Sequence, residues 1–540
     1  MACDVIVVGA GPTGLMAALL LKRSGVAVRI LDKNASAVKE SRAHAVHART
    51  LELFQSLGLV DRALEHGVLA TGIAVYVGGK RAASFSIDDM GRSDTPFPTV
   101  MMLPQSDTEA MLVAALEEAG VTVERGTEVT AIRQSAAGVT VETGAEAIDC
   151  AYAIGADGAH SVVRKQLGLS FEGAAYPQAF LLADCEVEWD IEPGPFCLFM
   201  HGASFALFLP LKGSRRGRVI ALDTATTADP SLRQGSSPAT LDEVEAAFRL
   251  ATRRDVRLRD ARWVSRYRVH HRGVNAYRVG WVFVGGDAAH IHSPAGGQGM
   301  NTGLQDMANL AWKLAAVLKA GAPDALLESY DAERRPVGET VLAFTDRAFS
   351  AATVQGGILS TLRDGIVPIL GATAGRSDFV RRRMFGFVSE LGIRYEGGEA
   401  LLPDGAPKDL AHGPAPGRRA PDARINRTTA IFDLVGGYRF HLIAFARSPL
   451  GAEEIETLSR DLAALGAPAL ATHIVAHSFV GPDPRIVQPE TGAAFTAYGV
   501  ADDARALYLI RPDGHVAGRW SGLDLAPVRA ALDRFGLVTA

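Results

Sequence analysis

The feature that most constrains this 540-residue chain is a glycine-rich turn between a strand and a helix near its N-terminus. The residues run as an apolar strand at 4–8, the turn Gly9-Ala10-Gly11-Pro12-Thr13-Gly14, an Ala/Leu-rich helix at 14–24 and a second strand at 27–31. Continuous apolar strands joined through a helix are typical of parallel sheets that are buried on both faces. The pattern therefore predicts a Rossmann-like βαβ unit that binds a dinucleotide.

Each glycine of this turn has a physical role. Gly9 permits the tight turn, Gly11 lets the backbone approach a pyrophosphate, and Gly14 lets the helix pack close to the strand. The helix N-terminus offers N–H groups and the positive end of its dipole to the phosphates. Asp32 ends the second strand, where it is placed to accept hydrogen bonds from ribose hydroxyls. The turn alone does not distinguish FAD from NAD.

Two later glycine motifs favour FAD. The first spans 152–164 and contains Asp157-Gly158, and the second spans 285–301 and contains Gly286-Asp287. In the second motif a buried strand ends at Asp287, whose carboxylate can bind the ribityl hydroxyls of a flavin. The loop that follows has few bulky side chains, so its backbone can lie flat against a planar ring. A helix starting near Gly299 can stabilise negative charge on the N1/C2=O edge of a reduced flavin.

These motifs resemble those of class A flavoprotein monooxygenases of the para-hydroxybenzoate hydroxylase type. More narrowly, the chain is similar to aromatic polyketide hydroxylases and rifampicin-type monooxygenases. Further matching segments are Ser41-Arg42-Ala43, 48–53, Leu103-Pro104-Gln105 with Glu109, 301–306, 309–314, 330–336 and 510–516. The resemblance covers nearly the whole chain and implies an α/β fold. A discontinuous Rossmann-like FAD-binding domain is expected with a β-rich substrate domain and a C-terminal thioredoxin-like α/β domain.

The expected domain boundaries follow the composition and this resemblance. Residues 1–72, 101–177 and 271–400 are expected to form the FAD-binding domain with a helical extension. Residues 73–100 and 178–270 form the substrate-binding middle domain, 401–423 a proline-rich linker, and 424–540 the thioredoxin-like domain. The last domain has no cysteine pair. We therefore expect a structural or oligomeric role for it and no dithiol chemistry.

The resemblance implies a set of FAD contacts. The pyrophosphate is expected to contact Gly9, Gly11, Thr13 and Gly14, and the adenosine to contact Asp32 and Lys33, with Val129 behind the adenine. The phosphates and ribityl region are expected to contact Arg42 and Gln105, and the ribityl chain to contact Gly286 and Asp287. The isoalloxazine is expected to contact Gly299, Met300 and Asn301, and its reacting face to be bordered by Pro294 and Gly297. Asp157 and Arg164 lie in a motif linked to both FAD and reduced nicotinamide binding. Two positions depart from the family pattern: Asp32 replaces the commoner Glu, and Gly280-Trp281 replaces Gly-Arg.

The activity implied by the resemblance is hydroxylation of a bulky phenolic or quinonoid, polyketide-like substrate. NAD(P)H reduces FAD, O₂ adds at flavin C4a, and the hydroperoxide passes its terminal oxygen to the ring. No side chain is assigned as a catalytic base, although His44, Arg272 and the segment 196–211 are candidates to face the substrate. Baeyer–Villiger insertion, epoxidation and antibiotic inactivation stay open, as do an oxidase or reductase and a flavin-free binding protein. NADPH or NADH, and monomer or homodimer, are also left open.

Composition excludes several other classes. The formal net charge of −5 argues against nucleic-acid and anionic-membrane partners. The basic runs 215–218 and 381–383 are interpreted as solvated faces of helices or loops. Four scattered cysteines indicate reduced, buried thiols and a cytoplasmic protein, and no apolar run reaches the roughly 18 residues of a membrane span. His290-Ile291-His292 has metal-like spacing, but it lacks a nearby acidic or Cys ligand, so no metal is expected.

Overall fold

The N-terminal βαβ unit forms as the sequence predicts. The computed structural model describes residues 3–37, 43–86, 94–192, 194–213, 215–224, 238–292, 296–352, 385–386, 388–404, 410–465, 469–477 and 483–537. Strand β1 (Val5–Val8) pairs in parallel with β2 (Val28–Asp32), and helix α1 (Pro12–Arg23) connects them. The helix begins two residues before the predicted start because the fixed φ of Pro12 suits the first helical position.

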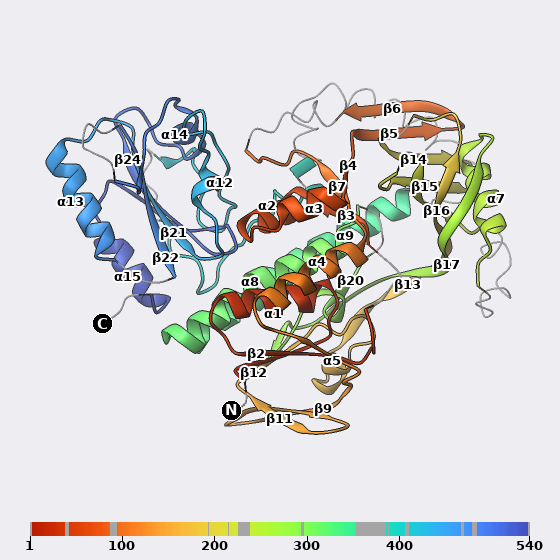
Figure 1. Ribbon diagram of the computed structural model, residues 1–540, viewed down its shortest axis with the longest axis horizontal. Coiled ribbons are helices and arrows are strands. Elements are labelled where there is room, and N and C mark those ends of the chain that lie inside the picture. The colour runs from red at the N-terminus through yellow and green to blue at the C-terminus, as the bar shows by residue number, and fades with distance from the viewer. Residues whose placement is uncertain are drawn as a thin grey trace.

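This unit belongs to a six-stranded sheet with the order β18-β19-β12-β1-β2-β8. The remaining strands are β8 (Val123–Arg125), β12 (Tyr152–Gly155), β18 (Arg278–Val279) and β19 (Val282–Val284). The helices around it are α2 (Ala48–Ser56), α3 (Val60–His66), α4 (Gln105–Glu118), α5 (Val162–Gln166), α8 (Gly299–Ala320) and α9 (Glu328–Ala352), with 3₁₀ turns at Gly286–Ala288 and Asp324–Leu327. Figure 1 shows α8 running through the middle of the molecule, between this sheet and the C-terminal region.

Two three-stranded sheets flank this region. One has the order β11-β10-β9, and the other the order β3-β7-β4. Their strands are β9 (Val129–Ser135), β10 (Gly138–Thr143), β11 (Ala147–Cys150), β3 (Ala45–His47), β7 (Val100–Met102) and β4 (Val68–Leu69). The second small sheet lies between the six-stranded sheet and the larger sheet described next, because Ala45 and Met102 pack in the same apolar cluster as residues of that larger sheet.

An eight-stranded sheet has the order β20-β17-β13-β16-β15-β14-β5-β6. The strands are β5 (Gly72–Val77), β6 (Lys80–Ser86), β13 (Phe171–Glu188), β14 (Phe196–His201), β15 (Ser204–Pro210), β16 (Arg216–Leu222), β17 (Arg257–Val274) and β20 (His290–Ile291). Helix α7 (Leu241–Thr252), which begins with a Thr240–Glu243 capping box, covers one face. Because side chains alternate along a strand, Leu181 and Ala183 face α7, whereas Phe180 and Leu182 face the small sheet β3-β7-β4.

One sequence prediction fails in this sheet. The basic run 215–218 was interpreted as a solvated face, but Arg218 is 1% exposed. It forms two hydrogen bonds of 2.7 Å with Asp184 on the neighbouring strand β13. The interpretation was wrong because the partner lies 34 residues away in the sequence and becomes a neighbour only through strand pairing. The second basic run, 381–383, lies outside the described residues.

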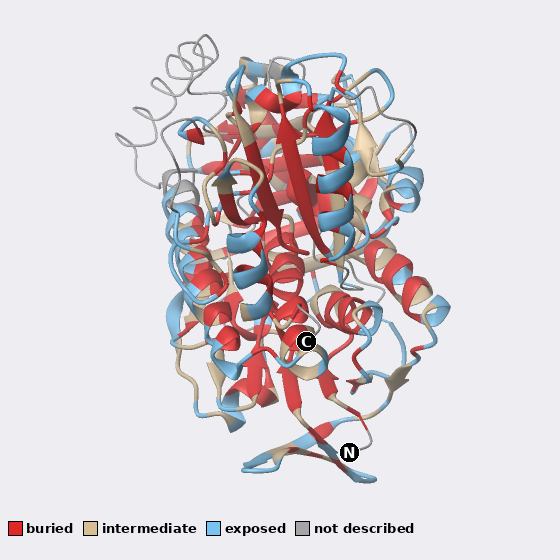
Figure 2. Ribbon diagram, turned by 90° about the vertical axis from the view of Figure 1, so that its left-hand side faces the viewer, coloured by how far each residue is buried: buried red, intermediate tan, exposed pale blue. Residues whose placement is uncertain are grey.

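The C-terminal residues form a five-stranded sheet with the order β23-β22-β21-β24-β25. Its elements are β21 (Phe440–Ala446), β22 (Leu470–Ala476), β23 (Ile486–Val487), β24 (Arg505–Ile510), β25 (Val516–Ser521), α12 (Ile431–Leu434), α13 (Ala452–Ala463), α14 (Ala493–Ala497) and α15 (Ala526–Arg534). Figure 2 shows the central strands of this sheet as buried and the helices beside them as largely exposed. The whole chain is thus a mixed α/β protein, as expected.

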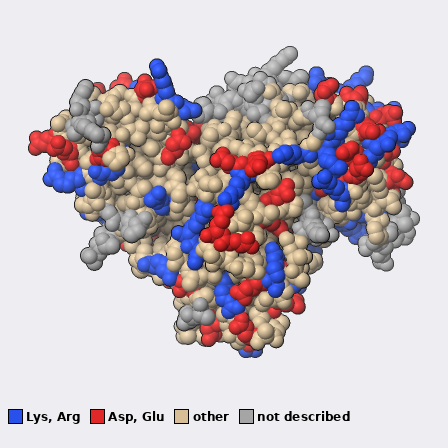
Figure 3. Space-filling model, in the orientation of Figure 1, with Lys and Arg blue, Asp and Glu red and all other residues tan. Residues whose placement is uncertain are grey.

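The proline-rich segment before this sheet is packed against it over residues 410–423. Leu410 and Ala420 are buried, and Arg519 donates hydrogen bonds to the carbonyl oxygens of Leu410 and Gly413 at 2.7 and 2.9 Å. The four cysteines are buried free thiols that lie outside the C-terminal sheet, as predicted. Positive and negative side chains are interspersed on the face seen in Figure 3. Among the described residues no helix is both long and apolar enough to cross a bilayer.

A buried ion network joins the C-terminal sheet to α8 and α9. Glu333 on α9 accepts hydrogen bonds from Arg511 at 2.7 and 2.9 Å and from Lys313 of α8 at 2.9 Å, and all three side chains are fully buried. Arg511 also pairs with Asp513. Burial raises the pKa of Glu333, but Arg511 and Lys313 outweigh this effect and lower it to about 2. The C-terminal region is therefore held by a charge cluster whose central side chains are fully buried.

This network predicts a large cost for Arg511→Met. The substitution keeps most of the side-chain volume but leaves Glu333 and Asp513 buried with one cation fewer. We expect the free energy of unfolding in urea to fall by about 3–5 kcal/mol. The matched control is Arg505→Met at the start of β24, the strand that ends just before Arg511, because its ion pair with Glu454 is solvent-exposed and should contribute little. Equal unfolding midpoints for the two variants would contradict the role of the network.

Candidate flavin-binding site

The first glycine turn brings β1, α1 and β12 unusually close together. Gly9 has φ +101°, and a Cβ there would lie 2.4 Å from the carbonyl oxygen of Ala156. A Cβ at Gly14 would lie 1.9 Å from the carbonyl oxygen of Gly9. A Cβ at Gly11, by contrast, would meet no atom within 4 Å. Gly9 and Gly14 are thus required by the protein's own packing, whereas Gly11 borders open space at the start of α1.

The start of α1 presents unused backbone donors to that space. The N–H groups of a first helical turn have no partner within the helix, and no side chain caps α1. Asp32 orients the turn from below: its Oδ2 accepts from the N–H of Ala10 at 2.7 Å, and its Oδ1 accepts from the N–H of Asn34 at 2.7 Å. A carboxylate has further acceptor capacity for a ribose hydroxyl. Lys33 beside it is exposed.

Thr13 joins the first glycine turn to the second. A Cβ at Gly286, which has φ +57°, would lie 2.4 Å from Thr13 Oγ1, and a Cβ at Gly303 on α8 would lie 2.5 Å from the same atom. Two turns more than 270 residues apart in sequence therefore meet at one side chain. Asp287, at the tip after β19, is exposed on this side of the sheet.

The side chain of Asn301 holds the start of α8 against β3. Its Oδ1 accepts from the N–H of His47 at 2.9 Å, and its Nδ2 donates to the carbonyl oxygens of Ala45 and Gly297 at 2.8 and 2.9 Å. Gly297 has φ +64°, and a Cβ there would lie 2.7 Å from the Cβ of Ala45. The amide of Asn301 is thus used within the protein. No side chain caps α8, which begins at Gly299 and continues with the buried Met300.

The Asp157 motif is tied to the second glycine turn. Asp157 accepts hydrogen bonds from Ser161 Oγ at 2.5 Å and from two N–H groups at the start of α5. Arg164 on α5 donates to the carbonyl oxygen of Ala288 at 3.0 Å. Asp157 therefore stabilises the turn and the helix that carries Arg164, and Arg164 supports the loop after β19.

The remaining predicted residues lie around these turns, with two exceptions. Gln105 at the start of α4 accepts from the N–H of Ala43 and donates to Glu109 at 2.9 Å. Val129 is buried at the start of β9. Arg42 and Pro294 lie outside the described residues.

Sequence reasoning missed a buried chain of polar groups under the second turn. His290 Nε2 lies 2.7 Å from Asp306 Oδ2, and His290 Nδ1 lies 2.7 Å from His292 Nε2. Asp306 also accepts from the N–H of Gly286 at 3.1 Å and from Arg334 at 2.8 Å. Burial raises the pKa of Asp306, but Arg334 and His290 outweigh it and lower it to about 2. The histidine pair thus serves the architecture of the loop, and the described residues contain no cluster suited to a metal ion.

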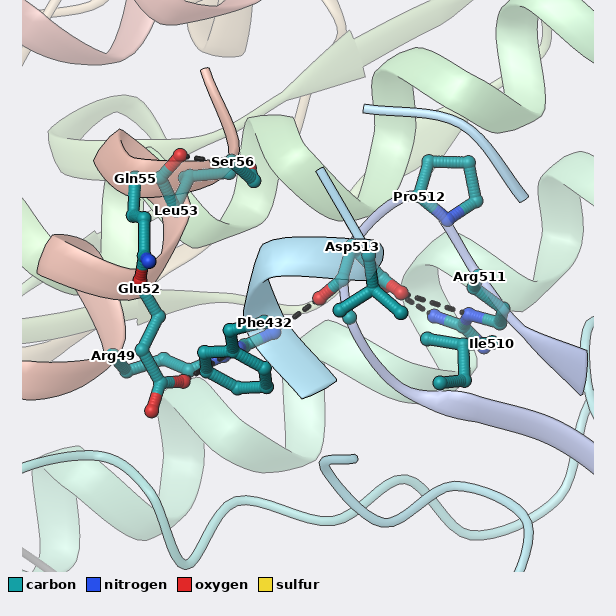
Figure 4. Close-up of a pocket in the computed structure, with 12 residues that line it drawn as sticks. Arg49, Glu52, Leu53, Gln55, Ser56, Phe432, Ile510, Arg511, Pro512 and Asp513 are labelled. Atoms are coloured by element: carbon teal, nitrogen blue, oxygen red, sulfur yellow. Dashed lines mark hydrogen bonds and ion pairs between the residues drawn. The ribbon is translucent and has the colours of Figure 1, made fainter. Parts of the chain in front are cut away.

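A separate pocket lies between α2 and the C-terminal region (Figure 4). Arg49 crosses it, donating to Glu52 at 2.8 Å and to the carbonyl oxygen of Asp513. Residues that line the pocket include Gln55, Phe432 and Gly514. None of its lining residues belongs to the glycine turns, and its charged groups are already paired. It is therefore a polar gap in the contact between α2 and the C-terminal region and no part of the flavin site.

These features fit an FAD. The space beside Gly11, the two uncapped helix starts, and the acceptors Asp32 and Asp287 match a pyrophosphate, a ribose and a ribityl chain. Thr13 lies against the second glycine turn, and Asn301 joins the start of α8 to β3. The arrangement defines the class of protein as a flavoprotein with a Rossmann-like cofactor site.

Comparison with known proteins narrows this class. A family model described as an FAD binding domain matches residues 2–345. The chain is 32% identical to the 6-methylpretetramide 4-monooxygenase of Streptomyces rimosus over 99% of this chain and 94% of that protein. Among solved structures it is similar to the flavin-dependent monooxygenase PieE in complex with FAD and substrate (25% identity, TM-score 0.78, 99% of both chains). It is also similar to CabE, an aromatic hydroxylase from angucycline biosynthesis (31% identity, TM-score 0.74, 100% of both chains).

The chain belongs to this family of FAD-dependent monooxygenases, and it is an enzyme that uses FAD. The resemblance stated from the sequence motifs is thereby confirmed. The glycine spacing predicted the first turn, and the Gly286-Asp287 motif predicted the second. The side chains that connect the two turns, Thr13 excepted, could not be assigned from spacing.

The geometry predicts opposite behaviour for two neighbouring glycines. Gly11→Ala should leave the thermal unfolding midpoint of the FAD-free protein unchanged, because the added Cβ meets no protein atom. It should weaken FAD binding at least tenfold, because the methyl group enters the space beside the helix start. Gly14→Ala should lower the unfolding midpoint of the FAD-free protein itself. FAD titration by fluorescence and thermal unfolding measure both effects, and an unchanged FAD affinity for Gly11→Ala contradicts the assignment.

A buried acid near the start of α8 predicts a pH effect. Glu390 accepts hydrogen bonds from Thr302 and Gln305, and burial, partly offset by Arg334, raises its pKa to about 8. Because this folded-state pKa exceeds the ordinary 4.5, the protonated form stabilises the fold at low pH, and this stabilisation is lost as pH rises through about 8.

Glu390→Gln removes this titration. The unfolding free energy of the variant minus that of the wild type should therefore rise between pH 5 and pH 8.5, by more than about 1 kcal/mol. Glu396→Gln, at an exposed ion pair with Arg394, is the control and should give a flat difference. A flat difference for Glu390→Gln as well argues against a buried neutral acid.

Proposed function

We propose that this monooxygenase uses NAD(P)H and O₂ to hydroxylate a bulky, multi-ring aromatic substrate. The observation that carries the proposal is the convergence of both glycine turns on Thr13, with α1 starting uncapped beside open space at Gly11 and α8 starting uncapped at Gly299. The names of the similar 6-methylpretetramide 4-monooxygenase and the angucycline aromatic hydroxylase support a polycyclic aromatic substrate. Oxygen insertion into a ring is the alternative on the same scaffold.

The proposal assigns the protein's own residues to binding and orientation. FAD, when bound, supplies the electron transfer and the oxygen chemistry. The proposed contacts of FAD are Gly9, Gly11, Thr13, Gly14, Asp32, Lys33, Arg42, Gln105, Val129, Asp157, Gly286, Asp287, Pro294, Gly297, Gly299, Met300 and Asn301. Backbone donors at the start of α1 hold the pyrophosphate, and those at the start of α8 stabilise negative charge near the ring. The apolar walls around the ring exclude water from the reaction.

The proposed division of labour is made by residue range. Residues 1–72, 101–177 and 271–400 bind FAD, and 73–100 and 178–270 hold the substrate. Residues 401–423 lead into a thioredoxin-like domain at 424–540 that acts as a structural element. The reduced nicotinamide approaches the Asp157 and Arg164 motif, and the protein is a monomer or homodimer. Four buried free thiols support a reducing, cytoplasmic location.

A single purification tests the function. The protein should show flavin absorption bands, and anhydrotetracycline, 2-naphthol or a hydroxyanthraquinone should accelerate its oxidation of NADPH or NADH. The product should gain about sixteen mass units, which is one oxygen atom. Comparing NADPH with NADH identifies the reductant, and the product's structure separates hydroxylation from ring insertion. A protein that stays colourless after incubation with FAD would contradict the proposal.

A further inference from the structure

One wall of the eight-stranded sheet is apolar and incompletely covered. The face turned away from α7 carries Phe180, Leu182, Ile220 and Leu222, and it faces Ala45 on β3. Several apolar side chains of the same cluster are only half-buried: Val75, Val100, Phe196, Leu198, Trp263 and Tyr267. Partly exposed apolar side chains inside a fold are the surface that a flat ligand covers.

This wall adjoins the proposed flavin site. Ala45 packs against the wall, and its Cβ is 2.7 Å from the position of a Cβ at Gly297. Its carbonyl oxygen accepts the hydrogen bond from Asn301 at the start of α8. A ring lying on the wall would therefore be next to the loop that borders the reacting face.

An ion pair interrupts this apolar wall. Asp184 and Arg218 are directly opposite each other on β13 and β16, in line with Phe180 and Leu182 on one strand and Ile220 and Leu222 on the other. Arg218 holds the carboxylate with two hydrogen bonds of 2.7 Å and lies 4.9 Å from the ring centre of Trp263. The side chain of Arg218 is 2% exposed, whereas that of Asp184 is 15% exposed. The carboxylate is thus the accessible member of the pair.

His44 approaches the same carboxylate from the opposite side. It precedes β3, and its Nε2 lies 3.9 Å from Asp184 Oδ2, which is longer than a hydrogen bond. Burial and the neighbouring Arg218 lower the pKa of His44 well below its usual range, so the imidazole is neutral. A carboxylate and a neutral imidazole therefore approach each other here without a direct hydrogen bond.

A buried ion pair is a weak source of stability, because both charges lose their hydration. Apolar residues at these two positions would complete the wall at no such cost. Stability alone therefore does not explain why this pair is present. An accessible hydrogen-bond acceptor in an apolar wall can instead recognise a donor group of a ligand. An ionised carboxylate accepts hydrogen bonds and donates none. It favours a hydroxyl and disfavours a carbonyl at the same place.

We propose that Asp184 is the specificity-determining contact for a phenolic hydroxyl of the substrate, with Arg218 positioning its carboxylate and His44 lying beside it. The inference rests on the proposed function and narrows its substrate class from phenols and quinones to compounds with a free hydroxyl on the ring system. The hydroxyl donates its hydrogen bond to Asp184 while the rings cover the half-buried apolar side chains.

The test is equilibrium dialysis of the oxidised, FAD-loaded enzyme with two probes, in the absence of NAD(P)H. 2-Naphthol carries the hydroxyl, and 2-methoxynaphthalene has the same rings without the donor. We expect the wild type to bind 2-naphthol at least tenfold more tightly. The double variant Asp184→Asn/Arg218→Met removes both charges together, so neither is left buried alone. It should reduce the preference to less than threefold.

The same sheet offers a matched control on its other face. Arg266 pairs with Asp223 at 3.0 Å and with Glu243 of α7 at 2.7 Å, and it lies opposite Leu181 of the α7-facing cluster. The double variant Asp223→Asn/Arg266→Met should keep the full preference for 2-naphthol. FAD content and the FAD dissociation constant, measured for every variant, should equal those of the wild type.

Four results overturn the inference: no preference in the wild type, a preference that survives in Asp184→Asn/Arg218→Met, an equal loss in the control, or binding of neither probe up to its solubility limit. A loss of FAD affinity confined to Asp184→Asn/Arg218→Met also overturns it, because the pair then serves the cofactor. Failure of the proposed function looks different. In that case the wild-type protein takes up no FAD or yields no oxygenated product, whatever the dialysis shows.

Discussion

Two adjacent residues of α9, Glu333 and Arg334, carry opposite charges and pair with different parts of the structure, and the rest of the structure depends on them. Glu333 binds Arg511 of the C-terminal region and Lys313 of α8. Arg334 binds Asp306, which in turn holds the N–H of Gly286 and the ring of His290. One helical turn therefore fixes both the C-terminal sheet and the second glycine turn of the cofactor site.

The cost of burying these charges explains why the arrangement is so specific. An isolated buried charge is strongly unfavourable, whereas a cluster with complete hydrogen bonding is tolerated. Arg511 and Arg334 both lie near Tyr395, with guanidinium carbons 5.1 and 6.0 Å from its ring centre, so the two halves of the cluster share one aromatic partner. A shift of α9 would leave several ions unpaired at once. Any other position of this helix would therefore raise the free energy of the folded state.

The sequence predicted those parts of the fold that local geometry determines. Gly9 and Gly14 are recognisable because their spacing reports a close approach of backbone segments that the same short stretch creates. The partners of Asp306, Asn301 and Arg218 lie on other elements, and nothing near them in sequence marks those partners. His290 and His292 show the difficulty most clearly: their spacing is metal-like, and the carboxylate that binds His290 lies on α8, where nothing in the local sequence marks it.

The two faces of the eight-stranded sheet show how one set of strands serves two purposes. On the α7 side, alternate residues such as Leu181, Ala183 and Val219 are fully covered, and the helix that covers them is held by its own capping box. On the other side the same alternation produces apolar residues that pack toward Ala45 and Met102 of the small sheet, and neighbours such as Trp263 stay half-buried. Asp184 and Arg218 interrupt this face. If that second face served stability alone, its charged pair would destabilise the fold without improving the packing of the core. An apolar wall with one accessible acceptor beside the flavin loop is what orienting a hydroxylated ring requires, because the wall gives affinity and the acceptor fixes which way the ring points.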